Sequence, residues 1–260
     1  MPLVRSKVGE NWFWYREDDR YVGQRVALGK YEPYLTKLML DNIDDQMTVV
    51  DVGANIGYDT VLFAKKAKRV LAFEPVRESF EILKKNIKEN KLKNVEVYEV
   101  ALGSKDEKKS LYKSEENYGD NRINGNYELR TANRELVNVK RLDEVVKENI
   151  DLIKIDVQGW EPEVIEGARN IIRKYHPIIF FENSPRMSRE AKVDTGRMWQ
   201  FLRQEYGQIY FIDEYVQIYY PTGRYDKECN LAVGLEKGWK QVRDFWPKKL
   251  LKRILGRPAT

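Results

Sequence analysis

Cysteine and histidine are almost absent from this sequence of 260 residues, which contains one of each, Cys229 and His176. A single cysteine excludes an intrachain disulfide framework and any cysteine-rich zinc site. No apolar run approaches the roughly 18 residues that a membrane span needs, and the first residues contain no apolar signal-peptide core. We therefore expect a cytoplasmic protein.

The net charge is small and unevenly placed. Lys and Arg number 46 against 41 Asp and Glu, a formal charge of +5. Residues 240–260 carry seven positive side chains and one negative, which leaves −1 for the other 239 residues. The first 239 residues therefore show no strong signal of nucleic-acid binding, because proteins that bind nucleic acid usually concentrate basic residues on a binding face.

Short apolar runs alternate with helical patterns through the centre of the chain. Strands are predicted at 47–52, 69–73, 95–100, 152–156, 178–182, 209–212, 216–220 and 229–235, and helices after the glycine turn at 53–57 and near 76–89, 160–174 and 193–206. This succession predicts an α/β fold with a doubly wound, mostly parallel sheet.

Three segments depart from this alternation. Residues 1–46 are aromatic and charged with a helical pattern near their end, which predicts an N-terminal helical cap on the domain of residues 47–236. Residues 102–141 are polar and predict a β-rich insertion above the strand ends, where insertions shape ligand sites. Residues 237–260 form a basic amphipathic tail. Its part from 239 to 260 could contact an anionic membrane surface, pack on the domain as a solvated extension, or bind RNA.

The sharpest motif is an acidic residue at a strand end followed by a glycine turn, Asp51-Val52-Gly53-Ala54-Asn55-Ile56-Gly57. Glycines let the backbone approach a ligand, and the helix that follows offers free N–H groups. The spacing differs from the G-x-G-x-x-G of dinucleotide sites. A carboxylate such as Asp51 suits a ligand with an ammonium group, and S-adenosylmethionine carries one together with a sulfonium.

Two further positions fit the same cofactor. Glu74 and Pro75 follow the next predicted strand, where a carboxylate can accept hydrogen bonds from both ribose hydroxyls; the alternative is an ordinary exposed acid. Ala101 follows the third strand and would lie near an adenine ring, although core packing explains it equally well.

The chain at this point resembles a known family. Val50–Gly57, Phe73-Glu74-Pro75, the V-A-L-G at 100–103 and the I-K-I-D-V-Q-G-W-E at 153–161 are together similar to the FkbM family of S-adenosylmethionine-dependent methyltransferases, over roughly residues 18–236. The resemblance implies a Rossmann-like class I methyltransferase fold with a seven-stranded sheet, and O-methylation of sugar or other hydroxyl groups as the commonest activity.

The resemblance also implies site residues. The expected cofactor-binding residues are Asp51, Gly53, Ala54, Asn55, Gly57, Glu74, Pro75, Ala101 and Asp156. The family often has Glu where this chain has Gln158, so we assign Gln158 no proton-transfer role. Glu161 matches the family pattern, but an acid in a first helical turn is also favoured by the helix dipole.

The residue that activates the acceptor is open at this stage. His176 precedes Pro177 just before the fifth predicted strand, at the end of the strand that points away from a ligand site, so we expect a structural role for it. Asp156, Glu182 and Asn183 come from two adjacent strand tips and could bind Mg²⁺. Otherwise Asp156 or Glu182 is a metal-free catalytic base, or both are structural acids bonded to loop backbone.

The leading hypothesis is therefore methyl transfer to a hydroxyl of a sugar, glycoconjugate or related small molecule. A nucleic-acid methyltransferase is the enzymatic rival, although residues 156–159 lack the Asn/Asp-Pro-Pro-aromatic run typical of amino-directed base methylation. The remaining alternative is a cofactor-binding interaction module without turnover.

Overall fold

The computed structural model describes residues 2–114, 117–123, 133–213, 218–222 and 228–235. The tail predicted at 237–260 lies outside the described residues, as do parts of the insertion. Among the residues described, no helix is long and apolar enough to cross a membrane.

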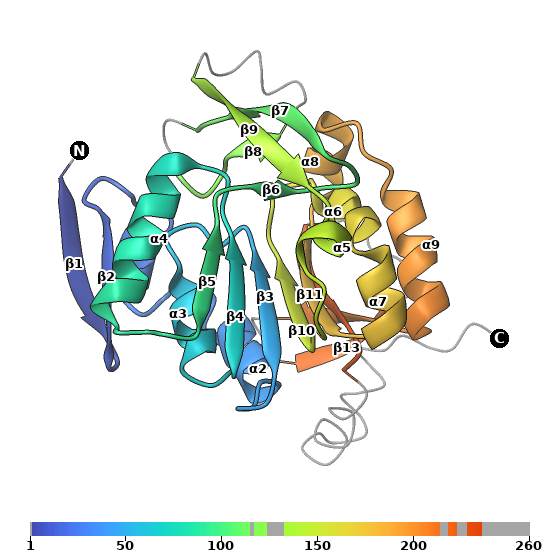
Figure 1. The fold of residues 1–260 in the computed structure, drawn as a ribbon, viewed down its shortest axis with the longest axis horizontal. Coiled ribbons are helices and arrows are strands. Elements are labelled where there is room, and N and C mark those ends of the chain that lie inside the picture. The colour runs from blue at the N-terminus through green and yellow to red at the C-terminus, as the bar shows by residue number, and fades with distance from the viewer. Residues whose placement is uncertain (1, 115–116, 124–132, 214–217, 223–227, 236–260) are drawn as a thin grey trace.

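A mostly parallel sheet forms the centre of the fold (Figure 1). Its order is β13-β12-β14-β11-β10-β3-β4-β5. The bounds are β3 (Thr48–Val52), β4 (Arg69–Phe73), β5 (Val95–Tyr98), β10 (Leu152–Ile155), β11 (Ile178–Asn183), β12 (Ile209–Asp213), β13 (Ile218–Thr222) and β14 (Cys229–Val233). The α/β fold class is confirmed. The sheet has eight strands where the family pattern implied seven, because β13 adds an antiparallel edge strand to β12.

Helices cover both faces of this sheet, as a doubly wound fold requires. The helices after the glycine turn are α3 (Tyr58–Ala64), α4 (Arg77–Glu89), α5 (Leu142–Val145), α6 (Glu161–Gly167), α7 (Arg169–Tyr175), α8 (Pro185–Glu190) and α9 (Thr195–Tyr206). Figure 1 shows α6, α7 and α9 together on one side, and α4 on the other. The central strands β3 and β10 are buried along their whole length, which explains why they are apolar except for Asp51, Lys154 and Thr48 at the start of β3.

The single helix predicted at 160–174 is divided into α6 and α7. The division falls after Gly167, where a side-chain Cβ would lie 1.9 Å from the carbonyl oxygen of Gly103. Because α6 touches the backbone at the start of the insertion here, the helical path shifts at Ala168 and resumes as α7.

The N-terminal cap contains the expected helices, α1 (Gly23–Ala27) and α2 (Pro33–Asp41), but begins with an unpredicted antiparallel hairpin of β1 (Leu3–Val8) and β2 (Asn11–Arg16). Asn86 of α4 and Asn90, which caps the end of this helix, attach the hairpin. Asn86 accepts from the Trp14 N–H at 2.6 Å and donates to its carbonyl at 3.0 Å, and Asn90 pairs with Trp12 in the same way. The outer edge of β2 thereby gains partners from a helix.

The predicted β-rich insertion is a separate four-stranded sheet of order β6-β9-β7-β8. Its strands are β6 (Ala101–Leu102), β7 (Glu107–Tyr112), β8 (Arg122–Ile123) and β9 (Arg134–Lys140). Figure 1 shows this sheet above one end of the central sheet. It therefore stands over the strand ends where the sequence predicts the ligand site.

Candidate active site

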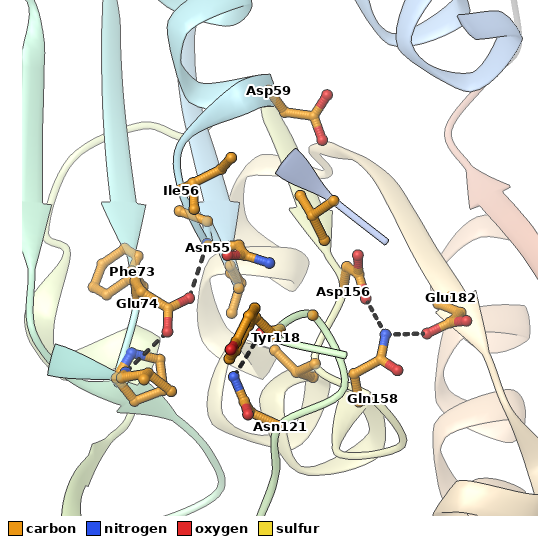
Figure 2. A pocket seen from close by; sticks show the side chains of 18 of the residues that line it. Asn55, Ile56, Asp59, Phe73, Glu74, Tyr118, Asn121, Asp156, Gln158 and Glu182 are labelled. Carbon is orange, nitrogen blue, oxygen red and sulfur yellow. Dashed lines mark hydrogen bonds between the residues drawn. The ribbon is translucent and has the colours of Figure 1, made fainter. Parts of the chain in front are cut away.

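A cavity of about 320 Å³ lies at the carboxyl ends of β3, β4, β10 and β11. Its wall is formed by the glycine turn, the segments after β4 and β10, the start of the insertion, and loop 117–121. Figure 2 shows side chains from these segments converging on one space. Ligands of doubly wound sheets bind at this position, where crossovers on opposite faces leave a crevice.

The glycine turn is held against both neighbouring strands. The N–H groups of Gly53 and Ala54 both donate to the Phe73 carbonyl at 3.0 Å. Gly53 has φ +78°, and a Cβ there would lie 1.9 Å from the Asp156 carbonyl oxygen. Gly57 packs on Leu83 of α4 and is absent from the cavity wall, whereas Gly53, Ala54 and Asn55 line the cavity.

Glu74 is buried in the cavity wall rather than exposed at a strand end. Its carboxylate accepts from the Asn55 N–H at 2.8 Å and the Val76 N–H at 2.9 Å. Burial raises the pKa of Glu74 to about 7, against the lowering effect of these two N–H groups. Each carboxylate oxygen retains a second lone pair that a ribose hydroxyl can use.

The part of the cavity wall that is formed by Pro75 and the strands of the insertion is apolar. Pro75, Ala101 and Leu102 line it, together with Leu111 and Ile123 from the insertion. The insertion thus supplies part of the wall expected to hold an adenine ring.

Asp51 lies behind the cavity wall. It is fully buried, accepts a 2.5 Å hydrogen bond from the Thr60 hydroxyl, and faces the Lys154 Nζ at 3.6 Å. Lys154 also lies 3.6 Å from Asp59 and 3.7 Å from Asp156. Burial lowers the pKa of Lys154, but the charges of Asp51, Asp156 and Asp59 raise it well above its usual value, so the side chain stays protonated.

The sequence analysis missed Lys154 and Asp59, although both line the cavity. A signal for Lys154 was present: it interrupts an otherwise apolar run in a strand predicted to be buried, and lysine is rarely buried without a partner.

Asp156 and Glu182 are brought together as predicted. The Gln158 amide bridges them, since its Nε2 donates to Asp156 at 2.8 Å and to Glu182 at 3.0 Å (Figure 2). Gln158 has φ +54°, so the loop holds it in a left-handed conformation that non-glycine residues rarely adopt. Burial, followed by the charges of Asp156 and Glu161, raises the pKa of Glu182 well above its usual range.

The predicted magnesium site is not supported by this geometry. Asn183 follows Glu182 on β11 and points away from the cavity wall, where its amide lies 4.0 Å from the Cys229 sulfur. The Gln158 amide donates its hydrogens to the two carboxylates, at the position a shared cation would need. Within the described ranges, no three His, Cys, Asp or Glu side chains gather into a metal-binding group.

The contacts of Glu161 and His176 indicate structural roles. One oxygen of Glu161 accepts from the N–H groups of Val157 at 3.1 Å and Gly159 at 3.2 Å, so the buried carboxylate closes the loop after β10. His176 ends α7 outside the cavity wall and packs edge to face on Tyr206.

Loop 117–121 of the insertion contacts the cap beside the cavity. The Tyr118 hydroxyl donates to Asp18 at 2.7 Å, and the Arg16 guanidinium lies 4.1 Å from the centre of the Tyr118 ring. Tyr118 and Asn121 line the cavity in Figure 2. Sequence patterns did not predict this contact, because it joins residues about one hundred positions apart.

The part of the chain that builds this site matches a known family. The family model for the methyltransferase FkbM domain covers residues 51–210, more than half of the chain. The chain belongs to the FkbM methyltransferase family. Its membership implies S-adenosylmethionine as the methyl donor, and the expected class I methyltransferase fold is confirmed.

Two curated relatives of this FkbM protein are methyltransferases. Methyltransferase 1 of Beauveria bassiana (strain ARSEF 2860) is 26% identical over 146 residues, which cover 47% of this chain and 59% of that protein. Methyltransferase sdnD of Sordaria araneosa is 28% identical over 167 residues, or 49% of this chain and 62% of that protein. The chain thus spans less than two thirds of the length of these relatives.

A solved structure supports the fold. Methyltransferase FkbM from Methylobacillus flagellatus KT superposes with a TM-score of 0.51 at 18% identity, over 74% of this chain and 44% of that one.

The cavity of this FkbM protein fits S-adenosylmethionine in the chemistry of its donors and acceptors. Asn55 and Asp59 each present a buried side-chain oxygen that accepts no hydrogen bond from any described residue. Such atoms are costly when left unpaired, and a ligand with hydroxyl and ammonium groups supplies the missing donors.

Proposed function

We propose that this protein transfers a methyl group from S-adenosylmethionine to a hydroxyl of a sugar, glycoconjugate or related small molecule. The observation that carries the proposal is the pair of Asp156 and Glu182, bridged by Gln158 in the cavity wall. Burial and the neighbouring charge of Asp156 raise the pKa of Glu182 well above its usual range, so this carboxyl ionises less readily than an ordinary one. Asp156 is therefore the carboxylate of the pair that we assign as the general base.

The roles of the protein groups follow from their contacts. Bound S-adenosylmethionine supplies an electrophilic methyl group. Asp156 accepts the proton of the acceptor hydroxyl, Gln158 fixes one oxygen of that carboxylate at 2.8 Å, and the Lys154 ammonium lies 3.7 Å from the other. A positioned base of this kind contributes a rate factor of about 10² to 10⁴.

The cofactor would lie along the glycine turn. We assign contacts with it to Gly53, Ala54, Asn55, Glu74, Pro75 and Ala101, all of which line the cavity. Asp51 and Gly57 support the turn from behind, through Thr60 and Leu83 respectively.

The remaining wall favours a neutral, hydroxyl-rich acceptor. Amide and phenol groups that can pair with hydroxyls line it, among them Asn117, Tyr118, Asn121, Gln158 and Asn230. The whole wall holds five carboxylates against the two cations Arg25 and Lys154, and Lys154 already faces three carboxylates. This charge balance argues against a phosphate backbone as the acceptor.

A methyl-transfer assay tests the proposal. The full chain is incubated with S-adenosylmethionine and a panel of glycans, glycosylated small molecules and RNA, with S-adenosylhomocysteine as the readout. Asp156→Asn should lower kcat at least a hundredfold and retain cofactor binding, whereas the surface control Glu99→Gln should keep full activity.

Three results would contradict the proposal. Transfer to RNA alone would favour the nucleic-acid rival, and cofactor binding without turnover on the panel would favour an interaction module. Loss of activity in EDTA with rescue by Mg²⁺ would reinstate a metal at Asp156 and Glu182.

A further inference from the structure

Three carboxylates surround one ammonium group where β3, β10 and the start of α3 meet. The Lys154 Nζ lies 3.6 Å from Asp51 Oδ1, 3.6 Å from Asp59 Oδ2 and 3.7 Å from Asp156 Oδ2. The Asp51 and Asp59 side chains are 0% and 5% exposed, and that of Lys154 is 9% exposed. With all four groups ionised, the cluster carries a net charge of −2.

The described residues do not compensate this charge. Asp51 Oδ1 and Asp59 Oδ1 are buried and accept no hydrogen bond from any part of the chain that the structure describes. Burial raises the pKa of the Asp59 carboxyl to about 6, and the Lys154 charge offsets this only in part. Buried carboxylates of this kind are stabilised by a further cationic donor.

Of the two carboxylates of this cluster with a buried oxygen unpaired among the described residues, Asp59 is the one that such a donor can reach from the cavity. It is the second residue of α3 and lines the cavity, whereas Asp51 lies behind the glycine turn. Tyr58 and Tyr31 line the cavity too, with ring centroids 5.5 Å apart. Aromatic faces near a carboxylate are a favourable environment for an ammonium group.

We propose that Asp59 binds the α-ammonium group of the cofactor's methionyl moiety. The proposal rests on the proposed function, since it takes S-adenosylmethionine as the ligand. Figure 2 shows Asp59 and Glu74 at separate places along the glycine turn, with Asn55 and Ile56 between them. A cofactor whose ribose lies at Glu74 therefore has its amino-acid end available for Asp59. The sequence assigned this contact to Asp51, which lies behind the cavity wall.

The test measures the affinity of the full chain for two ligands by isothermal titration calorimetry. The ligands are S-adenosylhomocysteine and its desamino analogue, in which hydrogen replaces the α-amino group. Wild type is compared with Asp59→Asn and with the control Asp41→Asn, since Asp41 is an exposed residue of α2 that pairs only with Lys37 in the described structure. We expect the wild type to bind S-adenosylhomocysteine at least tenfold more tightly than the analogue.

Asp59→Asn should lose at least tenfold in affinity for S-adenosylhomocysteine and stay within about twofold for the analogue, while Asp41→Asn changes neither. Equal losses for both ligands would indicate a structural role and overturn the proposal. Unchanged binding of S-adenosylhomocysteine by Asp59→Asn would also overturn it, and would assign the carboxylate to a cationic group of the acceptor.

The comparison of ligands in the wild type stands independently of how the variant folds. Equal wild-type affinity for the two ligands overturns the proposal and leaves the proposed function intact. Failure of the wild type to bind either ligand overturns the proposed function along with it, so the two failures are distinguishable.

Discussion

Lys154 places its ammonium group inside β10, a parallel strand whose residues are all buried. An isolated buried ammonium costs several kcal/mol, so lysine is kept at such a position only where opposite charges surround it. Asp51, Asp59 and Asp156 supply those charges from three different segments. One side chain thereby links β3, the first turn of α3 and the end of β10.

Replacing this side chain should damage the fold as well as the site. We expect Lys154→Met to lower the free energy of unfolding by about 3 kcal/mol or more near pH 7, because the buried Asp51 and Asp59 and the half-buried Asp156 lose their common cation. Urea denaturation provides the measurement. The control is Lys37→Met, which removes an exposed pair with Asp41 and should change stability by less than about 1 kcal/mol. Equal effects of the two substitutions would contradict this account.

Glu74 should make cofactor affinity depend on pH. Burial raises its pKa to about 7, and the ionised carboxylate can accept hydrogen bonds from both hydroxyls of the ribose proposed to lie there, whereas the protonated form loses one acceptor. Affinity for S-adenosylhomocysteine should therefore fall as pH decreases through 7, by up to roughly tenfold at pH 6. Calorimetry between pH 6 and 8 measures it. Glu74→Gln should bind more weakly at pH 8 and lose this pH dependence, and a variant that keeps the wild-type profile would refute the assignment.

The sequence was sufficient to predict the positions of Glu74, Asp156 and Glu182, because each lies at the carboxyl end of a strand with a clear apolar pattern. It failed for Asn183 because that residue was grouped with Glu182. Successive residues of a strand point to opposite faces, so only one of them can reach the cavity. Asp51 was placed too near the ligand because spacing along a chain does not reveal which atoms lie behind a turn.

At the scale of elements, the hairpin of β1 and β2 shows why some strands escape sequence patterns. Phe13 and Tyr15 point inward, but the outward residues Trp12 and Trp14 are aromatic too, so the alternation of apolar and polar residues disappears. The outward tryptophans lie against cations instead: the Arg5 guanidinium is 4.5 Å from the Trp12 ring and the Lys85 Nζ is 3.4 Å from the Trp14 ring. Such pairing of a cation with an aromatic ring depends on tertiary structure, so it leaves no periodic pattern in the local sequence.

The loop between β10 and α6 should make stability depend on pH through Glu161. Burial raises the pKa of Glu161 to about 7 in the fold, so its proton stabilises the native state below the unfolded-state pKa, and this contribution is lost as pH rises through 7. Glu161→Gln keeps the oxygen that accepts from Val157 and Gly159 and removes the charge. At pH 8 the variant should exceed the wild type in unfolding free energy by up to about 3 kcal/mol, and at pH 4 the difference should vanish.

Denaturant titrations of both proteins across this pH range measure the difference. Glu166→Gln is the matched control, since Glu166 belongs to the same helix and pairs with Arg169 at the surface. It should differ from the wild type by less than about 1 kcal/mol at each pH. A Glu161→Gln protein that is less stable than wild type at pH 8 would contradict the argument.

At the scale of the whole molecule, charge divides the chain into two parts. The first 239 residues sum to −1 and the last 21 to +6. If the basic tail contacts anionic lipid, the full chain should float with vesicles that contain phosphatidylserine, and a chain ending at residue 238 should not. Each basic residue near such a surface contributes about 1 kcal/mol, and salt should weaken the attraction. Equal flotation of the two chains would exclude the tail as the membrane contact.

The contacts of Tyr118 with Asp18 and Arg16 join the insertion to the cap, so the two sides of the cavity come from different parts of the chain. The floor of the cavity is made by the central sheet, and its roof by the insertion and the cap, which pack on each other beside it. In evolutionary terms loop 117–121 is the part of the roof that can vary: substitutions there can change which acceptor is admitted without touching Leu111 and Ile123, the insertion residues in the wall expected to hold the adenine ring. If the acceptor meets this loop, its choice depends on a segment that lies outside the motifs on which the family resemblance rests.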